Sequence, residues 1–557
     1  MSAELGGPGA GIAPAPGLPV HEAESRRVRI IGMMFAGAIC VSYVVVHPPS
    51  QDFASGHFRA QLASRGVHLW NNLWFGGHPL PGFGVVSPVL GGLFGVVPVS
   101  VVSVMAATWC FVLLIERWRS TTAGLPDPVV GVVLFAFGCG VDLWGGRLTF
   151  LPSVMFGAMA LLFLQRRRPW TMAACAALCG LSSPLGALSL SVVLAAAWFS
   201  RSAPRRLVVT ALLATVLPIG TLIVLFPEGG WFPFTLGTFV LLTAAVAGAG
   251  WCGRTVPIVR WSVFTYGVVV VGAFVMRSPL GGNVVRLGWL LAGPVAALTL
   301  CWHRRAMVPV VAAAALVWNL AYISMAFLPA DRTVSADYYD PLVTFVGTLP
   351  QPNRVEVVPT QTFAQADTLA LRIDGIARGW ETQLDRELNP EFYTGRLDAV
   401  TYHRWLTEHS VSIVALPLGR LREISLDEAA VIRSRPTYLR EVWESDDWQV
   451  FTVVDAAPLA DNGSVVVDVQ PDELVIDATR AGPTTVKFRY TDLYTVTEGA
   501  ACIAPAEGGW IRIVVKEPGR IRLIISLSVA GLLGHSTSSC PPADHHVTAG
   551  GDGILAT

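Results

Sequence analysis

Long apolar runs fill the chain between residues 29 and 330, and charged residues gather after residue 330. A bilayer core needs about 20 apolar residues per helix. The pattern therefore predicts eleven membrane spans, near residues 29–47, 97–115, 128–144, 148–164, 171–182, 185–199, 207–226, 232–251, 259–276, 284–301 and 307–327. The two spans between 171 and 199 are short, because SSPLG at 182–186 breaks the run. We interpret them as a re-entrant pair of half-length helices, which protein must shield from lipid.

After residue 330 the pattern changes to that of a soluble protein. Buried strands at 354–360, 411–417 and 448–454, with an amphipathic helix at 398–409, predict an α/β domain over 331–456. Short alternating strands between turn residues predict a small β-sandwich over 457–534. The remaining segments, 1–28 and 535–557, are predicted to be disordered tails.

Composition agrees with this division into a membrane domain (29–330) and a soluble part. The chain is 53% hydrophobic and only 14% charged, whereas soluble domains are typically about 25% charged. The fold class is thus an α-helical polytopic membrane protein with a C-terminal α/β and β region. The formal net charge is zero, so nothing in the totals points to a nucleic-acid partner.

Arginines orient the predicted spans in the plasma (inner) membrane. With the N-terminus inside, fifteen arginines precede the first span or fall in cytoplasmic loops, and five fall in the short outer loops. Positive residues favour the cytoplasmic side. The N-terminus is therefore expected in the cytoplasm, and the first loop and everything after about residue 330 outside it. Cys502 and Cys540 would then lie in an oxidising compartment, where they either pair or stay free.

The first outer loop holds the most informative residue. Asp52 is the only acid between Val46 and Gly84. A lone carboxylate beside the bilayer is placed to act as a general base, or it caps a helix or is simply solvated. The loop also carries His57, His78 and Trp74, which are candidates for substrate contact. The spacing of its histidines is not that of metal ligands, so the sequence supports no metal site and cofactor use stays open.

Two further outer segments carry isolated polar residues. Asp142 is the only acid in its apolar stretch, and Arg147 follows five residues later. An acid at a membrane boundary is a candidate functional residue, although a local Asp142–Arg147 ion pair is the simpler interpretation. Asn283 and Arg286 begin a predicted span. An arginine there either binds a phosphate through paired donors or extends to lipid headgroups.

Together these segments resemble the GT-C superfamily of membrane glycosyltransferases, and in particular a set of actinobacterial GT-C-like proteins. The resemblance rests on HPPSQDFASGHFRAQL, LWNNLWFGGHPLPG, DLWGGRLTF, SPLGGNVVRLG, NRVEVVPTQTF, ARGWETQLDRELNPEFYTGRLDAVTYHRWL and VSIVALP. Those enzymes take sugars from polyprenyl-phosphate carriers and keep an acid in the first outer loop. Asp52 matches that acid. Many members have two adjacent acids there, whereas Phe53 follows Asp52 in this chain.

The resemblance implies a GT-C-like fold and a transfer from a polyprenyl-phosphate sugar to an envelope glycan or glycolipid. Asp52 would be the general base, and a set of polar residues would bind the donor phosphate, namely Arg286, Asn283, Arg59 and Arg147. Residues expected to contact substrate are Asp142, His57, His78, Trp74 and Trp380. Two alternatives stay open, a noncatalytic GT-C-like scaffold and a transporter or flippase of lipid-linked sugar.

Overall fold

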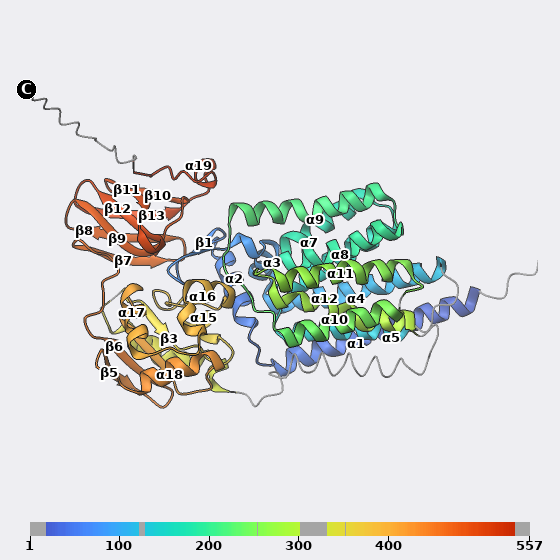
Figure 1. The fold of residues 1–557 in the computed structure, drawn as a ribbon, viewed down its shortest axis with the longest axis horizontal. Coiled ribbons are helices and arrows are strands. Elements are labelled where there is room, and N and C mark those ends of the chain that lie inside the picture. Colours follow the sequence, from blue (N-terminus) through green and yellow to red (C-terminus); the bar gives the residue numbers. More distant parts are fainter. Residues whose placement is uncertain (1–17, 122–127, 253, 301–330, 351, 541–557) are drawn as a thin grey trace, which may run out of the picture. The chain divides into compact units, whose positions relative to one another are not determined.

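The computed structural model describes residues 18–121, 128–252, 254–300, 331–350 and 352–540 (Figure 1). Contacts divide the chain into two compact units. We call them the helical unit, Met1–Arg65 with Pro81–Ala330, and the C-terminal unit, Gly66–Leu80 with Asp331–Thr557. Residues 66–80, which the sequence assigns to the membrane domain, therefore belong to the C-terminal unit.

The helical unit is built from long apolar helices that run side by side (Figure 1). They are α1 (Leu18–Val46), α4 (Val96–Thr121), α5 (Pro128–Trp144), α6 (Phe150–Gln165), α7 (Pro169–Ser182), α8 (Pro184–Ser200), α9 (Arg205–Leu225), α10 (Leu236–Cys252), α11 (Pro257–Val275) and α12 (Val285–Leu300). Shorter elements connect them, α2 (Phe53–Ser64), α3 (Val86–Phe94), and the 3-10 turns η1 (Pro81–Phe83) and η2 (Gly281–Val284).

Four of these helices are long and apolar enough to cross a membrane, namely Glu22–Val46, Val96–Trp118, Arg205–Leu225 and Pro257–Val275. Five further apolar helices are shorter, between 10 and 17 residues. This supports a membrane protein, while the count of eleven spans stays a prediction. The expected span at 307–327 lies outside the described residues.

Two sequence predictions can be compared directly with helix boundaries. The break expected at 182–186 is present, because α7 ends at Ser182, Ser183 is extended and α8 begins at Pro184. Whether this pair re-enters the membrane stays a prediction. The expected disordered tail over 1–28 is wrong for residues 18–28, which already form the first turns of α1.

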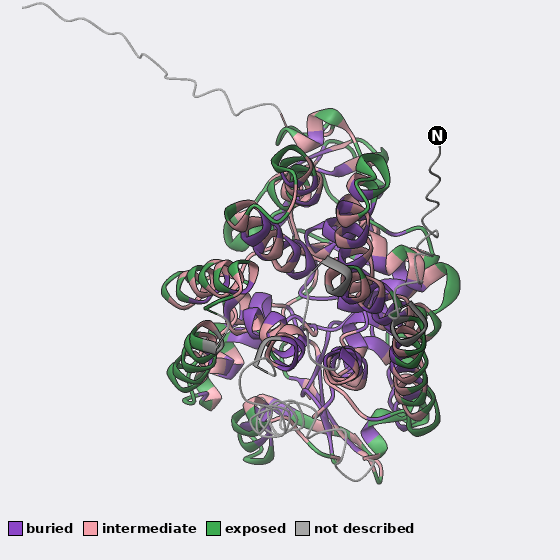
Figure 2. Ribbon diagram, turned by 90° about the vertical axis from the view of Figure 1, so that its right-hand side faces the viewer, coloured by how far each residue is buried: buried purple, intermediate pink, exposed green. Residues whose placement is uncertain are grey.

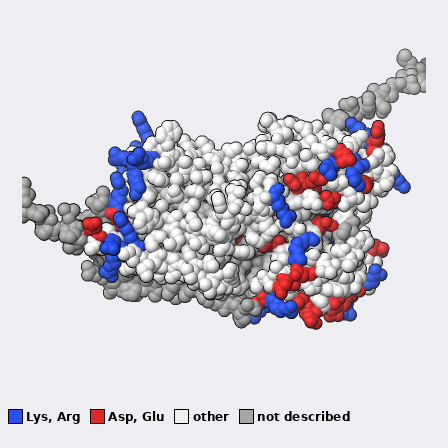
Figure 3. Space-filling view, turned by 180° about the vertical axis from the view of Figure 1, so that it is seen from behind, with Lys and Arg blue, Asp and Glu red and all other residues white. Residues whose placement is uncertain are grey.

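The surface of the helical unit is apolar along its flanks. Figure 2 shows this unit with buried residues inside and exposed residues on the outer helices. Large side chains such as Met34, Val224 and Val268 are exposed there, which soluble proteins avoid over extended areas. Figure 3 shows an uncharged flank with Lys and Arg gathered at one end of the unit.

The α/β domain of the C-terminal unit is a four-stranded sheet in the order β3-β4-β6-β5. Its strands are β3 (Val355–Val357), β4 (Ile413–Pro417), β5 (Leu439–Glu444) and β6 (Trp448–Val453). Its helices are α14 (Asp340–Gly347), α15 (Ala364–Thr368), α16 (Thr382–Leu388), α17 (Ala399–Glu408) and α18 (Leu426–Arg433). The pair β3–β4 is parallel and the others are antiparallel. The predicted helix at 398–409 is α17, which Asp398 caps by accepting a bond from the Thr401 N–H at 2.8 Å.

Two further sheets occupy the region predicted to be a β-sandwich, which we call the sandwich, in the orders β10-β13-β8-β7 and β11-β12-β9. Their strands are β7 (Ser464–Gln470), β8 (Glu473–Ala478), β9 (Gly482–Arg489), β10 (Tyr494–Glu498), β11 (Ala501–Pro505), β12 (Trp510–Val515) and β13 (Gly519–Ile525). Apolar residues alternate inward, so that Ile476 and Ile521 of one sheet and Ile511 and Ile513 of the other are fully buried.

A disulfide joins Cys502 on β11 to Cys540. The backbone next to Cys540 also pairs with β11, because the Ile503 N–H donates to Ser538 O and the Cys540 N–H donates to Ile503 O, both at 2.9 Å. Ser538 Oγ accepts from the Val496 N–H on β10 at 2.9 Å. The expected disordered tail from residue 535 is therefore wrong for residues 536–540, and its remainder from 541 lies outside the described residues.

Residues 66–80 are an integral part of the C-terminal unit. They form the two-stranded pair β1 (Trp70–Asn71) and β2 (His78–Pro79). Leu73 O accepts from the Ile376 N–H of the α/β domain at 2.9 Å, and Gly76 O accepts from the Arg489 N–H of the sandwich at 2.7 Å. This segment therefore ties the two C-terminal domains together.

Candidate functional site

Asp52 stands immediately before α2, but its carboxylate does not cap that helix. Instead Asp52 Oδ2 accepts from Arg147 Nε at 3.2 Å and from Arg286 Nη2 at 3.5 Å. The capping interpretation is therefore wrong, and two arginines from distant parts of the sequence converge on one carboxylate oxygen.

Arg147 lies in the turn between α5 and α6. A second ion pair joins its Nη1 to Asp142 Oδ1 at 3.2 Å, and the guanidinium lies over the Trp289 ring at 4.8 Å. The turn approaches the Asp52 segment closely at Gly146, where φ is +72° and an added Cβ would lie only 2.8 Å from Phe53 N. Only glycine allows this approach. The local Asp142–Arg147 pair expected from the sequence exists, and Asp52 extends it.

Arg286 lies in the first turn of α12, after η2. Its Nη2 also donates to Asn283 Oδ1 at 3.1 Å, one turn earlier in the chain, and its guanidinium faces the Phe150 ring at 5.9 Å. The network therefore joins α1–α2, α5–α6 and η2–α12. Five residues that the sequence singles out for separate reasons meet in it.

The side chains of this network differ in how far they are exposed. The side chain of Asp142 is 3% exposed and that of Arg147 9%, whereas Arg286 is 18% and Asp52 25% exposed. Two carboxylates balance two guanidinium groups, so the ionised network is neutral. Asp52 and Arg286 form its accessible side. There a carboxylate can accept a proton while the paired guanidinium donors hold an anion such as phosphate.

Arg59, also expected to bind phosphate, pairs with a different acid. On α2, Arg59 Nη2 lies 3.3 Å from Glu228 Oε1, and its guanidinium lies 4.3 Å from the Phe83 ring centroid. Both side chains are buried. Sequence reasoning missed Glu228, although it is the only acid between Asp142 and Asp331. The criterion that selected Asp142, an isolated acid among apolar spans, would have found it.

The other expected substrate residues lie in different settings. His57 stacks on Phe53 at 5.3 Å and its Nδ1 lies 3.0 Å from Gln61 Nε2. In the C-terminal unit, Trp74 and His78 are buried and stacked on each other at 5.8 Å. Trp74 Nε1 donates to Ala366 O at 3.0 Å, and Trp380 is half-buried. The burial of Trp74 and His78 gives both a packing role, and substrate contact by either would require that this packing open.

A second charged cluster lies inside the α/β domain. Arg378 is buried among three carboxylates, with N···O distances of 3.4 Å to Glu356, 3.8 Å to Asp385 and 3.6 Å to Glu428. Tyr402 donates to Glu428 at 3.0 Å and Tyr393 to Asp385 at 2.6 Å. These distances to Arg378 are longer than good charge-assisted hydrogen bonds. One guanidinium therefore does not fully compensate three buried acids.

The cluster has clear effects on protonation. Burial raises the pKa of Glu356 well above its usual value, and Glu428 beside it raises that pKa further. Burial also raises the pKa of Glu428. Burial acts to lower the pKa of Arg378, but the three carboxylates outweigh it and hold that pKa above its ordinary value. Burial therefore favours the neutral, protonated form of Glu356 and of Glu428, while Arg378 stays charged.

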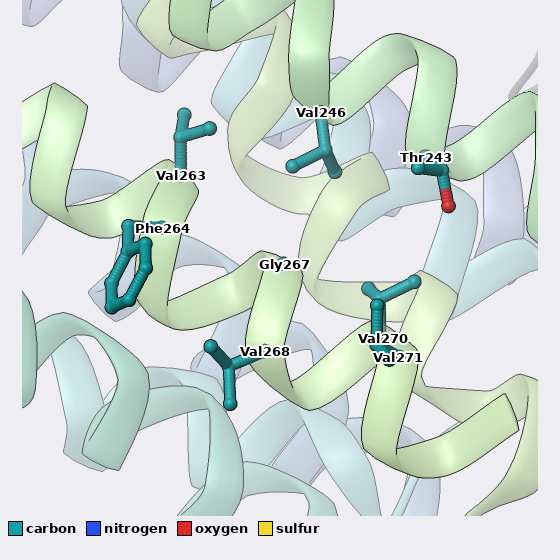
Figure 4. Close-up of a pocket in the computed structure, with 8 residues that line it drawn as sticks. All are labelled: Thr243, Val246, Val263, Phe264, Gly267, Val268, Val270 and Val271. Carbon is teal, nitrogen blue, oxygen red and sulfur yellow. The ribbon is translucent and has the colours of Figure 1, made fainter. Parts of the chain in front are cut away.

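The helical unit also carries an apolar surface groove of about 410 Å³ between α10 and α11. Figure 4 shows its lining, which is aliphatic and aromatic apart from the Thr243 hydroxyl. The groove is suited to a hydrocarbon chain, and its lining has no group that would recognise a particular headgroup.

Comparison with known proteins assigns no relative: no family model matches the chain, and no curated protein matches its sequence.

Proposed function

We propose that this protein is a membrane glycosyltransferase that moves a sugar from a polyprenyl-phosphate donor to an envelope glycan or glycolipid outside the cytoplasm. The observation that carries the proposal is the convergence of Arg147 and Arg286 on the partly exposed carboxylate of Asp52. This reaction needs two kinds of group side by side: a carboxylate that takes the proton of the acceptor hydroxyl, and cations that stabilise the leaving phosphate.

In the proposed step an acceptor hydroxyl oxygen bonds to the anomeric carbon of the donor sugar. The bond between that carbon and the phosphate oxygen breaks, and the polyprenyl phosphate leaves with the electron pair. Asp52 takes the hydroxyl proton, and Arg147 and Arg286 stabilise the charge on the leaving phosphate. General-base assistance of this kind contributes about 10²–10⁴-fold in rate.

The proposed location is a plasma membrane, with the C-terminal unit outside the cytoplasm. The arginine distribution supports this orientation. The disulfide between Cys502 and Cys540 supports it independently, because structural disulfides persist in oxidising compartments. Exposed apolar side chains on long helices, such as Val224 on α9, support contact with lipid.

The experiment compares envelope glycans and glycolipids by mass spectrometry in a strain lacking this protein, complemented with wild type or with Asp52→Asn at equal membrane levels. Restoration of a missing glycoform by wild type alone supports the enzyme, and the mass of the missing sugar identifies the donor. Equal restoration by both proteins contradicts the role of Asp52 as base and favours a noncatalytic scaffold. Ion-dependent uptake of lipid-linked sugar by proteoliposomes would instead indicate a transporter.

A further inference from the structure

The arginines of the Asp52 network are each held by a second polar partner. Arg147 has Asp142 at 3.2 Å, and that acid is the most buried member of the network. Arg286 has Asn283 Oδ1 at 3.1 Å. Both guanidinium groups therefore keep an anchor if Asp52 turns away, so their positions do not depend on the Asp52 carboxylate.

The bonds to Asp52 are long and lie on the exposed side of the network. Charge-assisted N–H···O bonds are usually about 2.7–2.9 Å long, whereas Asp52 Oδ2 lies 3.2 Å from Arg147 Nε and 3.5 Å from Arg286 Nη2. Asp52 is also the most exposed member, and residues 47–52 before α2 form no helix or strand. A side-chain rotation of Asp52 thus suffices to release both arginines from it.

From this geometry we propose that Asp52 occupies the phosphate position of its own site, and that the phosphate of a phosphorylated lipid displaces it from Arg147 and Arg286. The incoming phosphate oxygens take over the two guanidinium groups, and the Asp52 carboxylate moves into the space beside them. This inference rests on the proposed function and deepens it, because the displaced carboxylate is then available as a base only when a phosphate occupies the site.

The exchange keeps both guanidinium groups paired before and after a phosphate binds. With Asp52 paired, the two guanidinium groups are compensated at an apolar boundary, where uncompensated charge is costly. A bound phosphate restores that compensation after Asp52 leaves. The site therefore selects an anion over a neutral polyprenol.

Binding of farnesyl phosphate to the purified full-length protein in detergent tests this exchange. Isothermal titration measures Kd for wild type, Asp52→Asn and Arg286→Gln, with farnesol and inorganic phosphate as parallel ligands. In the Asp52→Asn variant, the two partly exposed ion pairs of Asp52 no longer compete with the ligand, which corresponds to about 2- to 30-fold tighter binding of farnesyl phosphate. We expect that gain for farnesyl phosphate with Asp52→Asn, weaker binding with Arg286→Gln and no change for farnesol.

Asp142→Asn is the matched control, because it removes an equal charge from the same network but leaves Asp52 on both arginines. Exchange predicts no gain in affinity for Asp142→Asn, whereas simple charge repulsion predicts the same gain as for Asp52→Asn. Glu116→Gln removes an acid that is paired with Arg29 on α1. This variant measures how far a change in net charge alone alters the affinity for farnesyl phosphate. If Asp52→Asn does not fold, Asp52→Ser serves in its place.

Unchanged or weaker binding of farnesyl phosphate by the Asp52 variants overturns the exchange. An equal gain for inorganic phosphate assigns the site to free phosphate, while a gain for farnesyl phosphate alone assigns it to a lipid phosphate. No sugar is transferred in these titrations. If the glycosyltransferase proposal fails, Asp52→Asn can still bind farnesyl phosphate more tightly than wild type. If the exchange fails, the protein can still transfer sugar.

Discussion

The raised pKa of buried Glu356 predicts that the α/β domain loses stability as pH rises. The carboxyls of Glu356 and Glu428 are fully buried on β3 and α18, with Arg378 as the cation between them. Burial raises the pKa of Glu356 well above its usual value. An unfolded glutamate ionises near pH 4.3, so above that pH the unfolded state releases a proton that the folded state retains.

The magnitude follows from proton linkage. Each pH unit between the unfolded and folded pKa values costs about 1.4 kcal/mol per retained proton. Glu356→Gln keeps the shape of the side chain and removes the titration. The variant is expected to gain stability over wild type by about 1.4 kcal/mol for each pH unit above 4.3, up to the raised pKa of Glu356.

Hydrogen exchange of peptides covering β4 (Ile413–Pro417), in the full-length protein in detergent, measures the opening free energy after correction for intrinsic rates. We compare the difference in opening free energy between Glu356→Gln and wild type, because His409 opposes the loss of stability with rising pH. Burial lowers the pKa of His409 to about 3, so His409 adds stability as pH rises toward its unfolded value, and it does so equally in both proteins. Glu387→Gln, at an exposed carboxyl on α16, is the matched control. A difference between Glu356→Gln and wild type that stays constant with pH would refute the raised pKa of Glu356.

Three further changes have expected outcomes. Cys540→Ser opens a loop that spans 38 residues to Cys502 and is expected to destabilise the sandwich by about 4 kcal/mol, measured by denaturant unfolding; an unchanged midpoint would count against it. Glu228→Gln removes the buried charge opposite Arg59 and should cost about 3–5 kcal/mol, seen as a lower Tm, whereas a loss of under 1 kcal/mol would be typical of an exposed pair. Trp74→Ala should cost about 3–5 kcal/mol and make residues 66–80 sensitive to protease, and full protease resistance would contradict their packing role.

The members of the Asp52 network could be predicted from the sequence, but their meeting could not. Asp52, Asp142 and Arg286 stand out because a charged residue in an apolar stretch is costly and needs a reason. Their convergence depends on how α5 packs against α1 and how α12 packs against α5. That packing is set by side-chain shape over many apolar positions, which one sequence does not reveal.

Buried polar residues of the C-terminal unit were harder to predict. Glu356 interrupts an apolar strand and Arg378 lies in a loop, and both residue types are usually exposed. Asn72 is similar, because its side-chain oxygen accepts from Tyr494 at 2.6 Å and from Trp70 Nε1 at 2.9 Å. Each of them has at least one partner that is distant in the sequence. The apolar alternation of β7, β8 and β13 is local, and their strands were therefore predicted correctly.

The most direct test of the central claim is the mass balance of transfer by the purified protein. Wild type and Asp52→Asn are reconstituted into liposomes with lipids and envelope glycans extracted from a strain lacking the protein, and donor and acceptor are followed by mass spectrometry. The account predicts that with wild type a polyprenyl-phosphate sugar is converted to polyprenyl phosphate while an acceptor gains the same sugar mass. It predicts that Asp52→Asn slows both changes by about 10²–10⁴-fold. Wild type that consumes no lipid-linked sugar, or an Asp52→Asn variant that transfers at the wild-type rate, would contradict it.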